Sequence, residues 1–314
     1  MNKITVIGAG NVGATCANVI AHKDLAKEVV LLDVKEGLAE GKALDIWQTS
    51  SINHFNTRVT GSTNDYLKTK GSGIIVITSG IPRKPGMSRD DLIKTNANIV
   101  KEVTEKAIKY SPDAIIIVVS NPLDVMTYAA FLAANKDPHK VFGMAGILDT
   151  GRYKAFLSTA LEVSPTDIHA MLLGGHGDTM VPLPRYTSVS GIPVTELLGP
   201  AVIEKIVDRT RKGGGELVSL MGTSAWYAPG AAVSQMVEAI VDDQKRIFPV
   251  CAYLDGEYEQ KKLYLGVPVK LGKGGVEEII EISLNADEKK LLTSSVESVK
   301  KVMKVLDDMK LFEE

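Results

Sequence analysis

A histidine between glycines is the first candidate for chemistry. His176 follows an apolar run and lies in the segment GGHGD at 174–178. Glycines allow the backbone many conformations and have no side chains that could cover the imidazole, so we expect His176 to face a cleft. Imidazole titrates near neutral pH, which suits a general acid or base. A lone histidine is usually structural, and we interpret the others in that way: His22, His54, His139 and His169.

Two carboxylates are candidates to orient His176. Asp149 lies in DTGR at 149–152, where the pattern predicts the start of a helix. Its spacing from Arg152 puts the two side chains on neighbouring helix faces, and a helix cap with a surface salt bridge explains them equally well. Asp178 is the other candidate. Spacing alone does not choose between them.

Two more arginines lie in a predicted loop and at the start of the helix that follows it. Arg83 lies in GIPRKPG at 80–86, a loop rich in glycine and proline. Ser88 and Asp91 have the spacing of a capping box, so Arg89 falls in the first turn of the next helix. A cation there opposes the helix dipole, a local misfit that indicates function. We expect Arg89 to be held by the helix and Arg83 to lie on a loop able to move; a solvated basic loop is the alternative for both.

A glycine loop near the N-terminus predicts a nucleotide site. The apolar run Ile4–Ile7 leads into GAGNVG, which opens a helix and brings backbone amides to a pyrophosphate. Asp33 ends the second apolar run, twenty residues beyond Gly13. A carboxylate there accepts the ribose hydroxyls and repels a 2'-phosphate, which predicts NAD over NADP. A glycine turn used only for packing is the alternative. The predicted phosphate loop is Gly8, Ala9, Gly10, Asn11, Val12 and Gly13.

The elements that must position these residues differ between the two halves. Residues 1–145 alternate apolar strands with helices, which predicts a doubly wound parallel sheet of the Rossmann type. The predicted strands are Ile4–Ile7, Val29–Leu32, Arg58–Gly61, Ile74–Thr78, Ala114–Val119 and Val141–Gly143. The predicted helices between them are Asn11–His22, Leu38–Thr49 and Asp90–Lys109.

Residues 146–314 read as a mixed α+β substrate domain. A hairpin is expected around Ser190 and Gly191. The other predicted elements are the helices Ala201–Lys212 and Ala231–Asp243, the strands Phe248–Leu254 and Tyr264–Lys270, and the helix Asp287–Met309. The triplet GGG at 213–215 interrupts helix-like sequence and predicts a bend.

Composition excludes several classes. The 314 residues are 45% hydrophobic and 24% charged, which is typical of a globular protein. A net charge of -2 gives no reason to expect nucleic acid. No apolar run is long enough for a membrane span, and the first strand follows Met1 too closely for a secretion signal. Cys16 and Cys251 form no disulfide framework or metal motif, so we expect a cytoplasmic protein without a metal site.

The chain resembles the lactate/malate dehydrogenase superfamily, in particular its NAD-dependent, lactate-dehydrogenase-like malate dehydrogenases. The resemblance spans nearly the whole length and rests on six motifs in order: GAGNVG, LLDV, IPRKPGMSRDDL, VVSNPLD, GMAGILDTGR and GGHGD. It implies that His176 is the acid/base and Asp149 its partner. It also implies a homodimer or homotetramer.

The same resemblance implies substrate and cofactor contacts. Arg152 would bind the carboxylate beside the reacting carbon, Arg89 would polarise the ketone oxygen, and Arg83 would bind the far carboxylate. Asn121 would reach both substrate and cofactor. The remaining residues expected along the NAD cleft are Asn96, Val119 and Ser120.

Arg83 carries the choice of substrate. In the superfamily an arginine at this position pairs with a second carboxylate, whereas glutamine accompanies pyruvate. An arginine facing the methyl group of pyruvate in a dry pocket would be an unpaired buried charge. We therefore expect interconversion of malate and oxaloacetate. The alternatives are a lactate dehydrogenase or broad 2-oxo acid reductase and, from another class, a non-catalytic NAD sensor.

Overall fold

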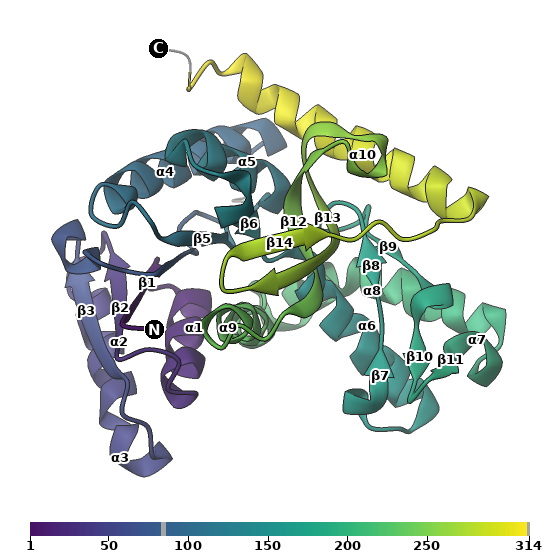
Figure 1. The fold of residues 1–314 in the computed structure, drawn as a ribbon, viewed down its shortest axis with the longest axis horizontal. Helices are drawn as coiled ribbons and strands as arrows, with labels where there is room; N and C mark the ends of the chain where they lie inside the picture. The colour runs from purple at the N-terminus through teal and green to yellow at the C-terminus, as the bar shows by residue number, and fades with distance from the viewer. Residues whose placement is uncertain (83–85, 313–314) are drawn as a thin grey trace.

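One nine-stranded sheet runs through the molecule. The computed structural model describes residues 1–82 and 86–312, and its strand order is β14-β13-β12-β6-β5-β4-β1-β2-β3 (Figure 1). The six parallel strands belong to the first half, as the apolar runs predicted. They are β1 (Lys3–Ile7), β2 (Glu28–Asp33), β3 (Arg58–Thr63), β4 (Ile74–Ile77), β5 (Ile115–Val118) and β6 (Val141–Gly143).

Helices cover both faces of this parallel part, which is why β4 and β5 are buried along their whole length. In Figure 1, α4 and α5 lie on one face and α1 lies on the other together with α9 (Tyr227–Val241) from the second half. The helices of the first half are α1 (Asn11–His22), α2 (Leu38–Gln48), α3 (Ser50–Asn53), α4 (Arg89–Ile108) and α5 (Leu123–Ala134).

The second half extends the same sheet with antiparallel strands, which sequence patterning did not foresee. Strand β12 joins the parallel part where Cys251 pairs with Gly143. A Cβ on Gly143 would lie 2.5 Å from Oγ1 of Thr127, so only glycine lets α5 and β12 approach this strand together. The added strands are β12 (Arg246–Asp255), β13 (Lys261–Gly272) and β14 (Gly275–Ile279).

Of the remaining elements, α9 and α10 pack against the sheet and its helices, and the others form a lobe beside it. The predicted hairpin around Ser190 and Gly191 is present as β10 and β11. The short strands are β7 (Ile168–His169), β8 (Leu172–Leu173), β9 (Val181–Pro182), β10 (Ser188–Val189) and β11 (Ile192–Pro193). The helices are α6 (Ala145–Leu161), α7 (Val194–Leu197), α8 (Pro200–Met221), α9 (Tyr227–Val241) and α10 (Ala286–Asp308).

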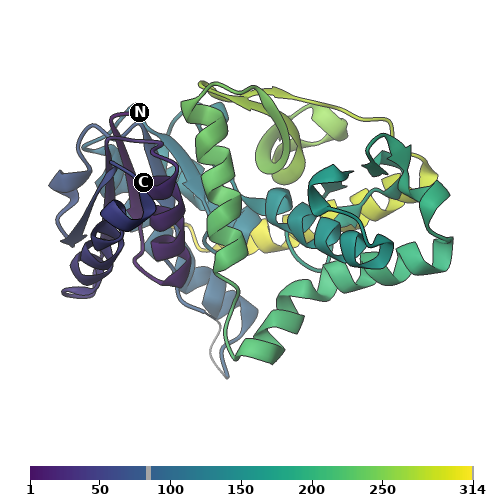
Figure 2. The ribbon, with the colours of Figure 1, turned by 90° about the horizontal axis from the view of Figure 1, so that it is seen from below.

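Three helix boundaries correct the expectations. Helix α6 begins at Ala145, so Asp149 lies inside it and is no cap. Helix α9 begins at Tyr227 and not at Ala231, and Pro229 is accommodated in its first turn. Helix α8 continues through the glycine triplet and ends only at Met221. Figure 2 shows α8 changing direction along its course.

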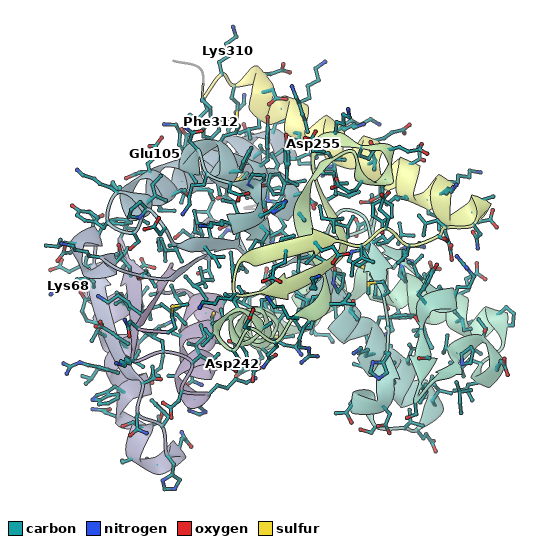
Figure 3. The ribbon with its side chains drawn as sticks, viewed as in Figure 1. Lys68, Glu105, Asp242, Asp255, Lys310 and Phe312 are labelled. Atoms are coloured by element: carbon teal, nitrogen blue, oxygen red, sulfur yellow. The ribbon has the colours of Figure 1, made fainter. Side chains whose placement is uncertain are left out.

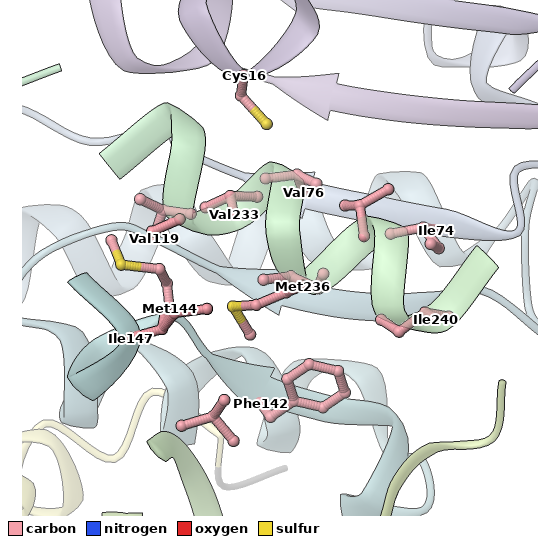
Figure 4. Packing of buried hydrophobic residues seen from close by; sticks show 14 of the residues in the cluster. Cys16, Ile74, Val76, Val119, Phe142, Met144, Ile147, Val233, Met236 and Ile240 are labelled. Carbon is pink, nitrogen blue, oxygen red and sulfur yellow. The ribbon is translucent and has the colours of Figure 1, made fainter. Parts of the chain in front are cut away.

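The core lies on both faces of the sheet and joins the two halves. Figure 4 shows Val233, Met236 and Ile240 of α9 against Val76 of β4 and Phe142 of β6. Charged side chains such as Lys68, Glu105, Asp242 and Asp255 are spread over the exterior (Figure 3). Within residues 1–82 and 86–312, no helix is both long and apolar enough to cross a membrane.

Candidate active site

The glycine loop forms a tight turn between β1 and α1. Gly8 has a φ of +106°, which favours glycine. A Cβ on Gly13 would lie 1.8 Å from the carbonyl oxygen of Gly8, so the helix packs on the turn without room for a side chain. Asp33, at the end of β2, accepts a hydrogen bond from the amide of Ala9 at 2.6 Å. The structure thus brings the predicted loop and the predicted ribose carboxylate together.

This turn fits a dinucleotide. Gly10 caps α1, and no side chain of the described chain caps the helix in its place. A Cβ on Gly10 would meet none of the described atoms within 4 Å. The first amides of α1, from Asn11 and Val12, are therefore open to a pyrophosphate. These residues and Asp33 would hold NAD.

Asn96 clamps two loops at the carboxyl edge of the sheet. Its Oδ1 accepts from the amide of Ile81 at 2.8 Å, and its Nδ2 donates to the carbonyl of Asn121 at 2.7 Å. Its side chain is buried, and its amide group is hydrogen-bonded to backbone atoms. Asn96 therefore fixes the segment after β5, including Ser120 and Asn121, against the loop after β4.

His176 meets Asp149 and Arg152 of α6. Nδ1 of His176 lies 2.8 Å from Oδ2 of Asp149, and Nη1 of Arg152 donates to Oδ1 of the same carboxylate at 3.2 Å. The side chain of Asp149 is 2% exposed and those of His176 and Arg152 are each 14% exposed. Asp178, the other candidate, is exposed. The structure therefore selects Asp149 as the partner of the imidazole.

The net electrostatic effect favours the protonated imidazole. Burial lowers the pKa of His176, but the charge and hydrogen bond of Asp149 and the charge of Asp124 raise it, against a smaller lowering by Arg152. The pKa of His176 ends above its ordinary value of 6.5. Because Nδ1 is bound to Asp149, Nε2 is the ring nitrogen left to exchange a proton.

A cavity of about 540 Å³ connects His176 with two other predicted site residues, Arg89 and Asn121. Arg89 is the first residue of α4, and Ser88 and Asp91 form the predicted capping box around it. Arg83, the predicted selector, lies outside the described residues. Another cavity, of about 450 Å³ beside Tyr258 and Leu292, contains none of the predicted site residues.

Arg152 has spare hydrogen-bonding capacity. In the part of the chain that the structure describes, its buried Nε has no partner. Gly213 of α8 packs on this side chain, because a Cβ there would lie 3.2 Å from Cδ of Arg152. The glycine triplet at 213–215, predicted only as a bend, therefore marks close packing of α8 against Arg152. A buried guanidinium with a free donor can bind a carboxylate.

Asp124, the last residue of the motif VVSNPLD, was not predicted as a site residue. Oδ2 of Asp124 accepts a hydrogen bond from the backbone amide of His176 at 3.1 Å. The sequence signal is only an acidic residue in the first turn of a helix, which a dipole effect explains without any site.

Comparison with known proteins gives a consistent assignment. Residues 2–143 match the lactate/malate dehydrogenase NAD binding domain, and residues 147–309 match the alpha/beta C-terminal domain of the same family. The chain is 64% identical over 307 residues to a malate dehydrogenase of Cytophaga hutchinsonii, covering 98% of each chain.

Solved structures agree. The malate dehydrogenase of Salinibacter ruber has a TM-score of 0.94 at 56% identity, with 98% of each chain covered. The lactate dehydrogenase of Cryptosporidium parvum, complexed with lactic acid and nicotinamide adenine dinucleotide, also has a TM-score of 0.94, at 38% identity and the same coverage. The shared fold therefore does not by itself distinguish malate from lactate.

Proposed function

The chain belongs to the lactate/malate dehydrogenase family, and from that premise we propose that it is an NAD-dependent malate dehydrogenase that interconverts (S)-malate and oxaloacetate. The observation that carries the proposal is the buried pair of His176 and Asp149 beside a cavity that also contains Arg89. The 64% identity to a relative named malate dehydrogenase supports malate over lactate.

In this proposal His176 moves the proton. Asp149 holds Nδ1 and stabilises the imidazolium, so that Nε2 gives a proton to the ketone oxygen of oxaloacetate and takes it back from the hydroxyl of malate. The glycine loop and Asp33 would hold NAD, which would supply or accept the hydride at the carbon that bears this oxygen. Asp33 supports NAD over NADP, since its carboxylate would repel a 2'-phosphate.

The arginines bind the substrate. Arg152, whose partly exposed guanidinium shares Asp149 with His176, is assigned to the carboxylate beside the reacting carbon. Arg89, lining the cavity with His176, is assigned to the ketone oxygen, where negative charge develops. Asn121 of the same cavity is assigned to substrate and cofactor. Arg83 is assigned to the far carboxylate from the resemblance alone.

We also place the enzyme in the cytoplasm, as a homodimer or homotetramer. Two buried free thiols, Cys16 and Cys251, fit a reducing compartment. The oligomer is proposed from the family resemblance alone.

The test is loss of NADH absorbance on addition of oxaloacetate, beside pyruvate, repeated with NADPH. We expect rapid loss with oxaloacetate and NADH, much slower loss with pyruvate, and poor use of NADPH. His176→Asn should remove the activity while the protein stays folded. Equal rates on the two acids would contradict the substrate assignment, and no activity on either would leave the NAD-sensor alternative.

A further inference from the structure

A second carboxylate, that of Asp124, lines the same cavity as His176 and contacts the backbone of the histidine loop. Asp124 is the second residue of α5 and is 9% exposed. Besides the amide of His176, its other oxygen, Oδ1, accepts from Sγ of Cys251 at 3.4 Å. Burial raises the pKa of the Cys251 thiol, and the charge of Asp124 raises it further, so the thiol stays protonated and can donate. Helix α5, strand β12 and the histidine loop therefore meet at this carboxylate.

The loop needs such anchors. Gly174 and Gly177 have φ values of +88° and +111°, so the segment has few conformational restraints of its own. Gly174 pairs with Gly266 of β13, and the amide of Gly175 donates to Oγ of Ser295 at 2.8 Å. The third anchor is Asp124, and it is the one that holds the backbone of His176 itself.

We propose that Asp124 is a positioning residue for the acid/base histidine: it fixes the backbone of His176 while Asp149 fixes the ring, and its negative charge faces the imidazole. The inference rests on the proposed function of His176. Asp124 also lines the cavity that contains Arg89 and Asn121, but its two oxygens accept from the amide of His176 and the thiol of Cys251, so we infer that it acts through the histidine.

The charge of Asp124 is what a merely structural role does not explain. An amide oxygen could accept the same hydrogen bond, and it would avoid the cost of burying a charge. Among the described residues, Asp124 forms no ion pair with a lysine or arginine. The titratable groups that face it are His176 and Cys251, and those that face His176 also include Asp149 and Arg152. The protonated imidazole of His176 is therefore the cation that this carboxylate stabilises.

Two substitutions separate the hydrogen bond from the charge. Asp124→Asn keeps an oxygen that can accept from the amide of His176 but removes the charge. Asp124→Ala removes both. Because small displacements of a catalytic group are costly, we expect Asp124→Ala to lower kcat for oxaloacetate by about 10²-fold. KM for oxaloacetate should rise as well, because loss of the charge leaves a smaller fraction of His176 protonated. Asp124→Asn should lose less.

Ser295→Ala is the matched control, because it removes the neighbouring anchor of the same loop without changing any charge. If kcat of Asp124→Ala matches the wild type, Asp124 does not position His176. If Asp124→Asn loses as much kcat as Asp124→Ala, the retained hydrogen bond has no positioning value, which also overturns the proposal.

An NMR titration of the five histidines, with His176 assigned from the resonance missing in His176→Asn, tests the charge directly. We expect the pKa of His176 to fall in Asp124→Asn and to stay in place in Ser295→Ala. An unchanged pKa in Asp124→Asn, or an equal fall in Ser295→Ala, overturns the proposal. The titration needs no turnover, so its failure is distinguishable from failure of the proposed function, which the wild-type assay on oxaloacetate tests.

Discussion

Replacing Asp149 by asparagine isolates the charge that stabilises the protonated histidine. Asparagine keeps the size of the side chain and can still accept from Nδ1 of His176. The negative charge, now 2.8 Å from that nitrogen, is lost. Arg152 then lies beside the imidazolium without the carboxylate that it shares with His176, which adds repulsion. We expect weaker oxaloacetate reduction for both reasons.

The magnitude follows from this geometry. Two unit charges 2.8 Å apart attract by about 6 kcal/mol at an effective dielectric constant of 20. This attraction is an upper limit on the effect of removing the charge. Asparagine keeps the hydrogen bond, so the loss is smaller than the full attraction, and we take about 3–5 kcal/mol as lost from the protonated form of the site that the reaction uses. The second range corresponds to a loss of roughly 10²- to 10⁴-fold in rate. We therefore expect kcat/KM for oxaloacetate to fall within that range.

NADH absorbance at several pH values is the assay, with the exposed Asp167→Asn as control for loss of one surface carboxylate. Without Asp149 the pKa of His176 falls, because that charge is a main cause of its elevation. The variant should therefore recover part of its activity on oxaloacetate as pH is lowered. If the variant keeps the wild-type rate, or if its loss of rate does not depend on pH, the charge of Asp149 does not stabilise the protonated form of His176.

Three further predictions concern other parts of the site. Arg83→Gln should lower oxaloacetate turnover steeply and improve pyruvate turnover; an unchanged ratio of the two kcat/KM values would show that Arg83 is not the selector. Gly13→Ala should weaken NADH binding and lower Tm, because its Cβ meets a backbone oxygen at 1.8 Å. Its control is Gly41→Ala in α2, where the new Cβ meets none of the described atoms within 4 Å and a helix gains stability. NADH fluorescence titration and thermal melts measure both, and equal behaviour of the two variants would contradict the packing argument. Finally, burial raises the pKa of Asp124 from 3.8 to about 6, so the folded state holds this proton more tightly than the unfolded state. The group therefore removes stability as pH rises through that window, by about 3 kcal/mol in all. Between pH 4 and 7, the free energy of unfolding in urea should rise for Asp124→Asn relative to the wild type. A difference between the two free energies that does not change with pH would be inconsistent with a buried charge at Asp124.

Local patterns predicted the cofactor half well. The glycine loop and Asp33 were assigned because a strand, a tight turn and a carboxylate at fixed spacing have one common use. The capping box at Ser88 and Asp91 likewise placed Arg89 at the start of α4, since it depends only on residues three apart.

Contacts between distant segments could not be predicted in the same way. Spacing alone left Asp149 and Asp178 as equal candidates and only the family resemblance favoured Asp149, whereas in the structure α6 places Asp149 against the imidazole ring. The antiparallel extension of the sheet depends on the close approach allowed by Gly143, and the role of Asp124 depends on α5 meeting the histidine loop. In each case the decisive contact joins residues that the sequence keeps far apart.

The pH dependence of KM for the two substrates tests the account most directly. If His176 carries the proton, oxaloacetate binds best to the imidazolium form and malate best to the neutral form. KM for oxaloacetate should therefore rise with increasing pH and KM for malate should fall, with both changes centred above pH 6.5, where the neighbouring carboxylates hold the pKa of His176. Flat or identical profiles for the two substrates would contradict the assignment of His176 as the proton carrier.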